Sequence, residues 1–162
     1  MTNDLTRVFF IGDVVGPAGL RCIASLLPGF LKEERVHFCI INGENATGGT
    51  GISASDTQKL FAAGADVITG GNHSFEKREF WNVFTDFPRV LRPANFPEYT
   101  LSAGQDEAAV FAPGQGAGIF EKDGIRYAVL NVQGRENMTP LDCPFRCADR
   151  QINSWLEDTE PP

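Results

Sequence analysis

The sequence has few histidines, few cysteines and no long apolar run, and each scarcity excludes a class of protein. Two of the 162 residues are histidine and four are cysteine, which does not favour a zinc knuckle made from these ligands. No apolar run approaches the roughly 20 residues that a membrane-spanning helix needs. The N-terminus carries Asp4 where a secretory signal would need a basic segment. We therefore expect a cytoplasmic protein with no membrane contact.

Basic residues are also in the minority. The chain has 14 Lys and Arg against 21 Asp and Glu, a formal net charge of -7. Without a basic face the protein should not bind long nucleic acids, and metal ions or local amides would have to hold any nucleotide. A hydrophobic fraction of 42% suits a single folded domain over residues 1–162.

The four cysteines do not have the spacing of a metal site. Cys22 and Cys39 stand in apolar surroundings, so we predict that both are small core residues. Cys143 and Cys147 lie four residues apart and have no histidine nearby. No cysteine is therefore a candidate ligand.

The first seventy residues repeat a strand, a Gly-containing turn and a helical stretch, the pattern of βαβ units. Pro17 suits the first turn of the first helix, whereas Pro28 should kink or end it. Ser53 and Asp56 resemble a capping box, and Gly64 should stop the helix that they begin. We predict strands at 7–11, 38–41 and 67–69, with helices at 17–32 and from Ser53 to about residue 63.

The second half of the chain is less regular. Phe80, Trp81 and Phe84 predict an amphipathic helix over 76–84. The Asp123-Gly124 pair favours the positive φ angles of a tight hairpin turn. We also predict a strand at 90–92, a long loop over 94–118, hairpin strands at 119–121 and 125–131, and a helix at 148–156.

This layout predicts an interrupted α/β fold. A parallel sheet normally has helices on both faces and a partner for each central strand. Here the sequence stops just after a helix that should lead into another strand. We therefore expect an α/β fold that is incomplete on its C-terminal side.

Polar side chains follow three of the predicted strands. Asp13 comes after the first strand, Glu44 and Asn45 after the second, and Asn72 and His73 after the third. The carboxyl ends of parallel strands meet at one edge of a sheet, so these groups should converge there. Taken singly, each segment also has a structural explanation as a turn or a helix entry. The coincidence of three such segments is what favours a site.

Carboxylate and amide oxygens suit Mn, Fe or Mg better than a thiolate-loving ion. A bridging carboxylate could hold two cations about 3.5–4 Å apart, the spacing that serves phosphoryl displacement. Imidazole groups exchange protons near neutral pH, so His73 beside such ions could protonate a leaving alkoxide. The pattern predicts a two-metal site for Asp13, Glu44, Asn45 and Asn72, with His73 as the catalytic acid.

Several blocks of sequence resemble the bacterial YmdB-type metallophosphoesterases, a branch of the calcineurin-like superfamily. The similarity runs from about Val8 to Asp149, and the NGENATGG and PANFP blocks are specific to this branch. The resemblance implies a four-layer α/β/β/α sandwich and hydrolysis of cyclic nucleotides or related small phosphodiesters. The matching blocks are GDVVG, NGENATGGTGIS, DVITGGNHSFEKREFW, LRPANFP, APGQGAG and VLNVQGRENMTPLDCPF.

The resemblance also implies residue roles. Asp13, Glu44 and Asn45 would hold one divalent metal ion, Fe or Mn before Mg, and Glu44 would bridge to a second ion on Asn72. His73 would be the proton donor as water or hydroxide attacks phosphorus. Gly48, Gly49 and Gly51 would let a loop pass close to the metals, or would form a mobile turn. Arg92 and Asn95 would line the same rim, or else be a surface strand residue and a turn former.

The chain departs from the family in two ways. Phe75 and Glu76 replace the usual Trp and Asp after the GNH motif, a mild change. The family also continues with two histidine-containing segments, whereas this chain has only His37 and His73. His37 precedes the second strand and is predicted to lie at the surface. We therefore expect the isolated chain to bind metal poorly and to show little phosphodiesterase activity.

Two other functions stay open. The chain could be a non-catalytic half that completes its sheet and site with a complementing polypeptide or in a homo-oligomer. It could also be a metal-independent nucleotide-binding module, although no GxGxxG fingerprint follows the first strand.

Overall fold

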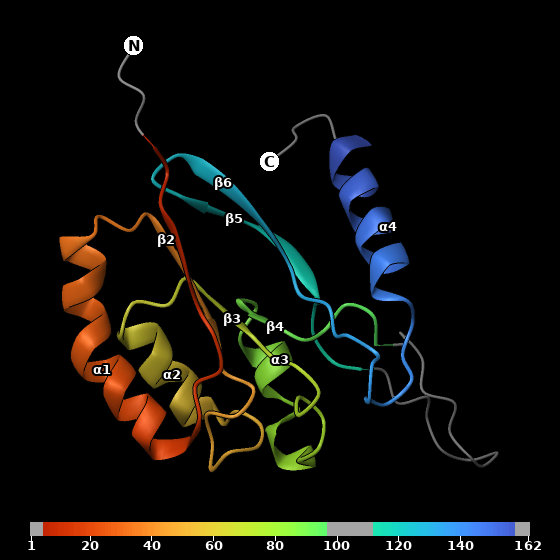
Figure 1. Ribbon diagram of the computed structural model, residues 1–162, viewed down its shortest axis with the longest axis horizontal. Helices are drawn as coiled ribbons and strands as arrows, with labels where there is room; N and C mark the ends of the chain where they lie inside the picture. Colours follow the sequence, from red (N-terminus) through yellow and green to blue (C-terminus); the bar gives the residue numbers. More distant parts are fainter. Residues whose placement is uncertain (1–4, 97–111, 158–162) are drawn as a thin grey trace.

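The computed structural model describes residues 5–96 and 112–157, and Figure 1 shows its path. The main sheet is parallel and its strands are ordered β1-β2-β3-β4, so spatial order follows sequence order. A separate antiparallel hairpin, β5-β6, forms a second sheet. The strands are β1 (Val8–Ile11), β2 (Phe38–Asn42), β3 (Val67–Thr69), β4 (Val90–Leu91), β5 (Ala117–Lys122) and β6 (Ile125–Leu130).

Helices and the hairpin cover opposite faces of the main sheet. In Figure 1, α1 and α2 stand side by side on one face, the hairpin lies on the other, and α4 lies on the far side of the hairpin. The mixed α/β class predicted from sequence is confirmed. The helical segments are α1 (Gly16–Glu33), α2 (Ala54–Ala62), the 3₁₀ turn η1 (Arg78–Phe80), α3 (Val83–Asp86) and α4 (Pro144–Glu157).

Alternating side chains of β2 join two apolar clusters. Cys39 and Ile41 belong to the cluster beneath α1 and α2. Phe38 belongs to the cluster shared with the hairpin, where its ring stacks on Tyr127 with centroids 4.1 Å apart. This alternation is the two-residue period of a strand buried on both faces.

Strand β1 is covered on one face only. Its register places Val8 beside Phe38 and Phe10 beside Ile40, so both side chains point toward the hairpin side. They are nevertheless 53% and 57% exposed. The hairpin therefore covers the central strands and leaves this edge of the sheet open.

The predicted helix signals operate as expected, with one exception. The Ser53 side chain accepts a hydrogen bond from the Asp56 N–H at 3.2 Å, which confirms the cap. Pro28 is predicted to kink or end α1, and the helix does not end there but continues to Glu33, close to the predicted end at 32. Pro28 lies on an exposed surface of the helix, where water can satisfy the carbonyl that loses its donor.

The predicted helix over 76–84 is wrong in extent. The structure has only η1 and α3 in this region, and neither has a side-chain cap. The Trp81 indole N–H donates to the Phe75 carbonyl at 3.0 Å, and the Phe75 ring packs against Trp81 and Phe84. Packing of this aromatic cluster prevails over the helical period, because short uncapped helices gain little from their own hydrogen bonds.

The predicted hairpin turn is confirmed. Asp123 and Gly124 have φ angles of 53° and 76°, as a two-residue type I′ turn requires. The middle of the predicted loop, residues 97–111, lies outside the described residues. Helix α4 begins at Pro144, four residues before its predicted start at 148.

The cysteines occupy different environments. Cys39 is buried, and burial, followed by the charge of Asp66, raises the pKa of its thiol to about 11. Cys22 is exposed on α1, so its prediction as a core residue is wrong. No helix among the described residues is long and apolar enough to cross a membrane.

Candidate metal centre

The polar segments that follow β1, β2 and β3 meet at the carboxyl-terminal edge of the main sheet. The backbone of the three turns is bonded together there: Val14 N–H donates to Asn42 O at 3.0 Å, and Gly43 N–H donates to Thr69 O at 2.9 Å. The predicted convergence of these segments therefore occurs. What each side chain does within the cluster stays a prediction.

Asn45 joins Asp13 to His73. Its Nδ2 donates to both carboxylate oxygens of Asp13, at 2.9 and 3.0 Å, and its Oδ1 lies 2.5 Å from His73 Nδ1. Because the amide nitrogen serves Asp13, the amide oxygen must accept from the imidazole, so Nδ1 carries the proton. The other ring nitrogen, Nε2, is then the atom able to exchange a proton with a bound molecule.

At the same edge, the Glu44 carboxylate lies against the backbone of Gly71, which has no side chain. A Cβ atom on Gly71 would lie 1.9 Å from Glu44 Oε2, so glycine alone leaves room for the carboxylate. Asn42 Oδ1 accepts from the Glu44 N–H at 3.1 Å, and Glu44 Oε2 accepts from the His73 N–H at 3.4 Å. The carboxylate is thus held beside His73.

Asn72 and Glu76 flank the histidine. Asn72 is half-buried, and its side chain makes no hydrogen bond within the described ranges. Glu76 Oε1 lies 3.6 Å from His73 Nε2, an ion pair when the imidazole is protonated. The His73 side chain is 29% exposed, so small molecules can reach it.

The loop after Asn45 curls back on the site. Gly48, Gly49 and Gly51 have φ angles of 64°, 90° and 78°, which L-residues rarely adopt. The Gly51 N–H donates to the Glu44 carbonyl at 2.6 Å, and the Gly49 N–H donates to the Asn45 carbonyl at 3.1 Å. These turns support the backbone from which Glu44 and Asn45 project.

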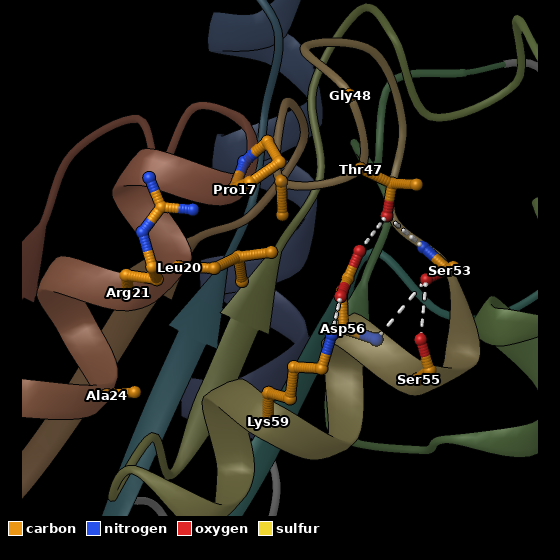
Figure 2. A pocket seen from close by; sticks show the side chains of 11 residues that line it. Pro17, Leu20, Arg21, Ala24, Thr47, Gly48, Ser53, Ser55, Asp56 and Lys59 are labelled. Atoms are coloured by element: carbon orange, nitrogen blue, oxygen red, sulfur yellow. Dashed lines mark hydrogen bonds and ion pairs between the residues drawn. The ribbon is translucent and has the colours of Figure 1, made fainter.

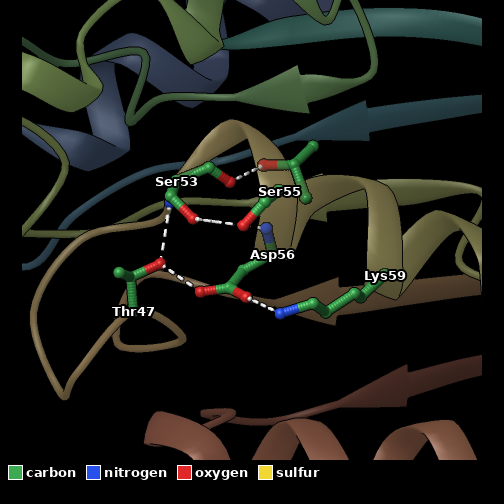
Figure 3. A network of polar contacts seen from close by, with 6 residues as sticks. Thr47, Ser53, Ser55, Asp56 and Lys59 are labelled. Carbon is green, nitrogen blue, oxygen red and sulfur yellow. Dashed lines mark hydrogen bonds and ion pairs between the residues drawn. The ribbon is translucent and has the colours of Figure 1, made fainter.

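A buried carboxylate fastens this loop to α2 (Figure 2 and Figure 3). Thr47 Oγ1 donates to Asp56 Oδ2 and Lys59 Nζ donates to Asp56 Oδ1, both at 2.7 Å. Thr47 Oγ1 in turn accepts from the Ser53 N–H at 2.8 Å. Burial raises the pKa of Asp56, but the hydrogen bonds from Lys59, Thr47 and Ser53 outweigh it, so this pKa is lower than usual.

Two further rim predictions are tested by the contacts. Asn95 is buried and donates to the carbonyls of Gln133 and Asp142, so it holds loops together. Arg92 is also buried, not a surface strand residue, and it donates to the Pro93 carbonyl at 2.9 Å.

Sequence reasoning did not identify two supporting residues. Asn131 Nδ2 donates to the carbonyls of Gly70 and Leu91, both at 3.0 Å, and so ties β6 to the rim. No local signal could have revealed this contact. Asn42, which orients Glu44, could have been recognised because Asn commonly caps the backbone two residues ahead.

The donor set fits part of a site for hard divalent cations. Asp13 and Glu44 supply carboxylates, and Asn45 and Asn72 supply amide oxygens, the ligand types that Mn²⁺, Mg²⁺ and Fe²⁺ accept. Over residues 5–96 and 112–157, no group of three or more His, Cys, Asp or Glu is placed to hold a metal. Two of the four candidate donors are amides, and the role of all four as metal ligands stays a prediction.

Comparisons with known proteins agree on one family. The family described as YmdB-like protein matches residues 9–161. A 2',3'-cyclic-nucleotide 2'-phosphodiesterase of Bacillus subtilis is 41% identical over 146 residues, which are 90% of this chain and 51% of that protein. A putative phosphatase/phosphodiesterase of Mycoplasma genitalium is 32% identical, over 88% of this chain and 46% of its own length. The chain thus spans about half the length of these relatives.

Two solved structures have a similar fold over most of this chain. The crystal structure of a hypothetical protein from Thermus thermophilus superposes with a TM-score of 0.78 and 34% identity, over 95% of this chain and 54% of that one. A phosphatase from Mycoplasma pneumoniae gives a TM-score of 0.76 and 28% identity, over 93% and 51% of the two chains.

Proposed function

The chain belongs to the YmdB-like protein family, and on this premise we propose that it is a cytoplasmic phosphodiesterase that cleaves small phosphodiesters, cyclic nucleotides among them, with two divalent metal ions. The activity in the name of the Bacillus subtilis relative supports this proposal. The single observation that carries it is the continuous contact from Asp13 through Asn45 to His73, with Glu44 at the same rim.

Asp13, Glu44 and Asn45 would hold one ion, and Glu44 with Asn72 would hold the second. Bound divalent ions supply charge neutralisation for the phosphoryl group and activate water near neutral pH. The Asn45 carbonyl oxygen has two lone pairs, so it can accept the His73 N–H and still act as a ligand. Gly71 leaves room for the Glu44 carboxylate, which would be shared by both ions.

His73 would protonate the departing oxygen from Nε2. Its Nδ1 is anchored on Asn45, so the ring is oriented before any substrate arrives. Glu76 Oε1 lies 3.6 Å from Nε2 and would form an ion pair with His73 when the imidazole carries both protons. In this scheme Asn45 is at once a ligand and a positioning residue for the acid.

Hydrolysis of bis(4-nitrophenyl) phosphate and of 2',3'-cyclic AMP, with and without Mn²⁺, tests the proposal. We expect slow Mn²⁺-dependent turnover that falls by roughly 10²-fold or more in His73→Gln, the loss typical of a removed general acid. His37→Gln is the matched control, because His37 contacts the Arg7 backbone and not the rim. Equal losses in both variants would contradict the role of His73.

A second candidate is a binding half that needs a complementing polypeptide. The exposed Val8 and Phe10 on the edge strand β1 favour it. Mixing the chain with the part of the Bacillus subtilis relative that it does not cover would then raise turnover well above that of either piece. Unchanged turnover and no complex in size-exclusion chromatography with light scattering would contradict this candidate.

A further inference from the structure

A pocket of about 620 Å³ lies between α1 and α2, on the helical side of the main sheet. Figure 2 shows Leu20 and Arg21 on one wall and Ser55 and Lys59 on the other. None of the candidate metal-centre residues lines it. Ala46, Thr47 and Gly48, from the loop that follows Asn45, line its third side, so the pocket adjoins this loop and shares no lining residue with the metal centre.

The charges around the pocket do not cancel. Asp56 is matched by Lys59 and by the Thr47 hydroxyl, both at 2.7 Å. Arg21 also lines the pocket, and it has no hydrogen bond or ion pair with any residue in the described ranges. One positive charge is therefore left for a ligand, in a protein whose overall net charge is -7.

The rest of the lining is divided between apolar and hydroxyl groups. Leu20 and Ala24 of α1 and the fully buried Ala46 give an apolar wall. Ser55 at the start of α2 adds an exposed hydroxyl that can donate a hydrogen bond. A volume between roughly 300 and 1,000 Å³ with few polar groups is typical of small-molecule sites.

We propose that this pocket binds a small phosphomonoester with a flat or apolar body, in the size class of a nucleoside monophosphate. The planar guanidinium of Arg21 suits two parallel hydrogen bonds to phosphate oxygens. In Figure 2 its side chain extends toward Pro17, which lies at the N-terminal end of α1. The apolar wall would contact the body of the ligand while Ser55 contacts its edge. This site does not depend on the proposed hydrolytic function.

Equilibrium dialysis with AMP in the presence of EDTA tests the proposal, with adenosine as the ligand that lacks phosphate. We expect AMP to bind at least tenfold more tightly than adenosine, and Arg21→Met to lose that advantage. Arg150→Met is the matched control, since Arg150 is an exposed arginine on α4 outside the pocket. Ala24→Trp should also abolish binding, because it fills the groove without removing a charge.

The double variant Asp13→Asn, His73→Gln separates this site from the metal centre. The proposal requires that it bind AMP as well as the unchanged chain, whether or not the enzyme is active. AMP binding lost in this double variant and kept in Arg21→Met would move the ligand to the strand-end cluster and overturn the proposal. Absence of AMP binding to the unchanged chain would overturn it too.

Discussion

The two faces of the main sheet differ in how completely they are covered. On the helical face, α1 and α2 pack over β1 as well as the inner strands, so Phe9 and Ile11 join a continuous cluster. On the opposite face the hairpin reaches Phe38, Val67 and Leu91 but leaves Val8 and Phe10 exposed. The candidate metal centre lies at the carboxyl-terminal edge of the main sheet, between these two faces.

This difference shows that the fold has two separate requirements, placing the strand ends and covering both faces of the sheet. Local βαβ packing is enough to place the strand ends that carry Asp13, Glu44 and His73. Covering the second face needs more apolar surface than the two-stranded hairpin offers. The outer surface of α4 adds to the exposed apolar area, because Phe145, Ile152 and Leu156 are all exposed there. The well-packed face therefore supports the site, and the open face is available for an interaction.

The largest expected effect contrasts two phenylalanines on the hairpin side. Phe38→Ala should lower the free energy of unfolding by about 3–5 kcal/mol, because it empties the cluster beneath Tyr127. Phe10→Ala should cost less than about 1 kcal/mol, since the ring is already 57% exposed. Urea denaturation of both variants measures the contrast. A similar loss for both would mean that the face of Phe10 is covered in solution.

The next effect concerns the rim. Gly71→Ala should weaken Mn²⁺ binding by roughly 10–100-fold, the loss typical when the groups that orient a metal ligand are changed, because the new Cβ would lie 1.9 Å from Glu44 Oε2 and displace the carboxylate. Titration with Mn²⁺, followed by electron paramagnetic resonance, measures the change. Gly29→Ala on α1 is the control, because open space surrounds that position. Equal Mn²⁺ affinity in both variants would contradict the proposal that Glu44 is a metal ligand.

The smallest effect concerns the hydrogen bonds that Asp56 makes with Thr47 and Lys59 on the helical face. Asp56→Asn should cost about 1–3 kcal/mol at neutral pH, because two short hydrogen bonds lose their charged acceptor. The pKa of Asp56 is lowered in the folded state, so its contribution is complete above the unfolded pKa of about 3.9. The contribution is lost as pH falls through the folded pKa.

The difference in unfolding free energy between the unchanged chain and Asp56→Asn should therefore shrink below about pH 4. Asp149→Asn on exposed α4 provides the comparison and should have little effect at any pH. A constant difference for Asp56→Asn across the pH range would contradict a role for the carboxylate charge.

Features with local causes were predictable from the sequence. The Ser53 cap and the Asp123-Gly124 turn depend on residues that are close in the chain, and both are confirmed. Over 76–84 the expected continuous helix is replaced by η1 and the start of α3, because the ring of Phe75 organises that segment through tertiary contacts. The helical spacing of apolar residues in the sequence does not reveal such tertiary contacts.

In the candidate site, too, the position of the segments was predictable and the contacts between side chains were not. Parallel strand order was sufficient to bring the Asp13, Glu44 and His73 segments to one edge. The link through Asn45 spans 32 residues to Asp13 and 28 to His73, and side-chain geometry at that range cannot be read from spacing. The roles assigned to these residues stay predictions until the variants above are measured.

Strand order in the main sheet has a consequence for how the protein is made. Each of β2, β3 and β4 pairs with the strand that precedes it in the chain, and each pairing joins residues 22 to 30 positions apart. Parallel pairing across such a crossover is slow, because the connecting helix must be in place first. Every strand nevertheless finds its partner already synthesised, so the main sheet can be assembled in the order in which a ribosome releases its strands.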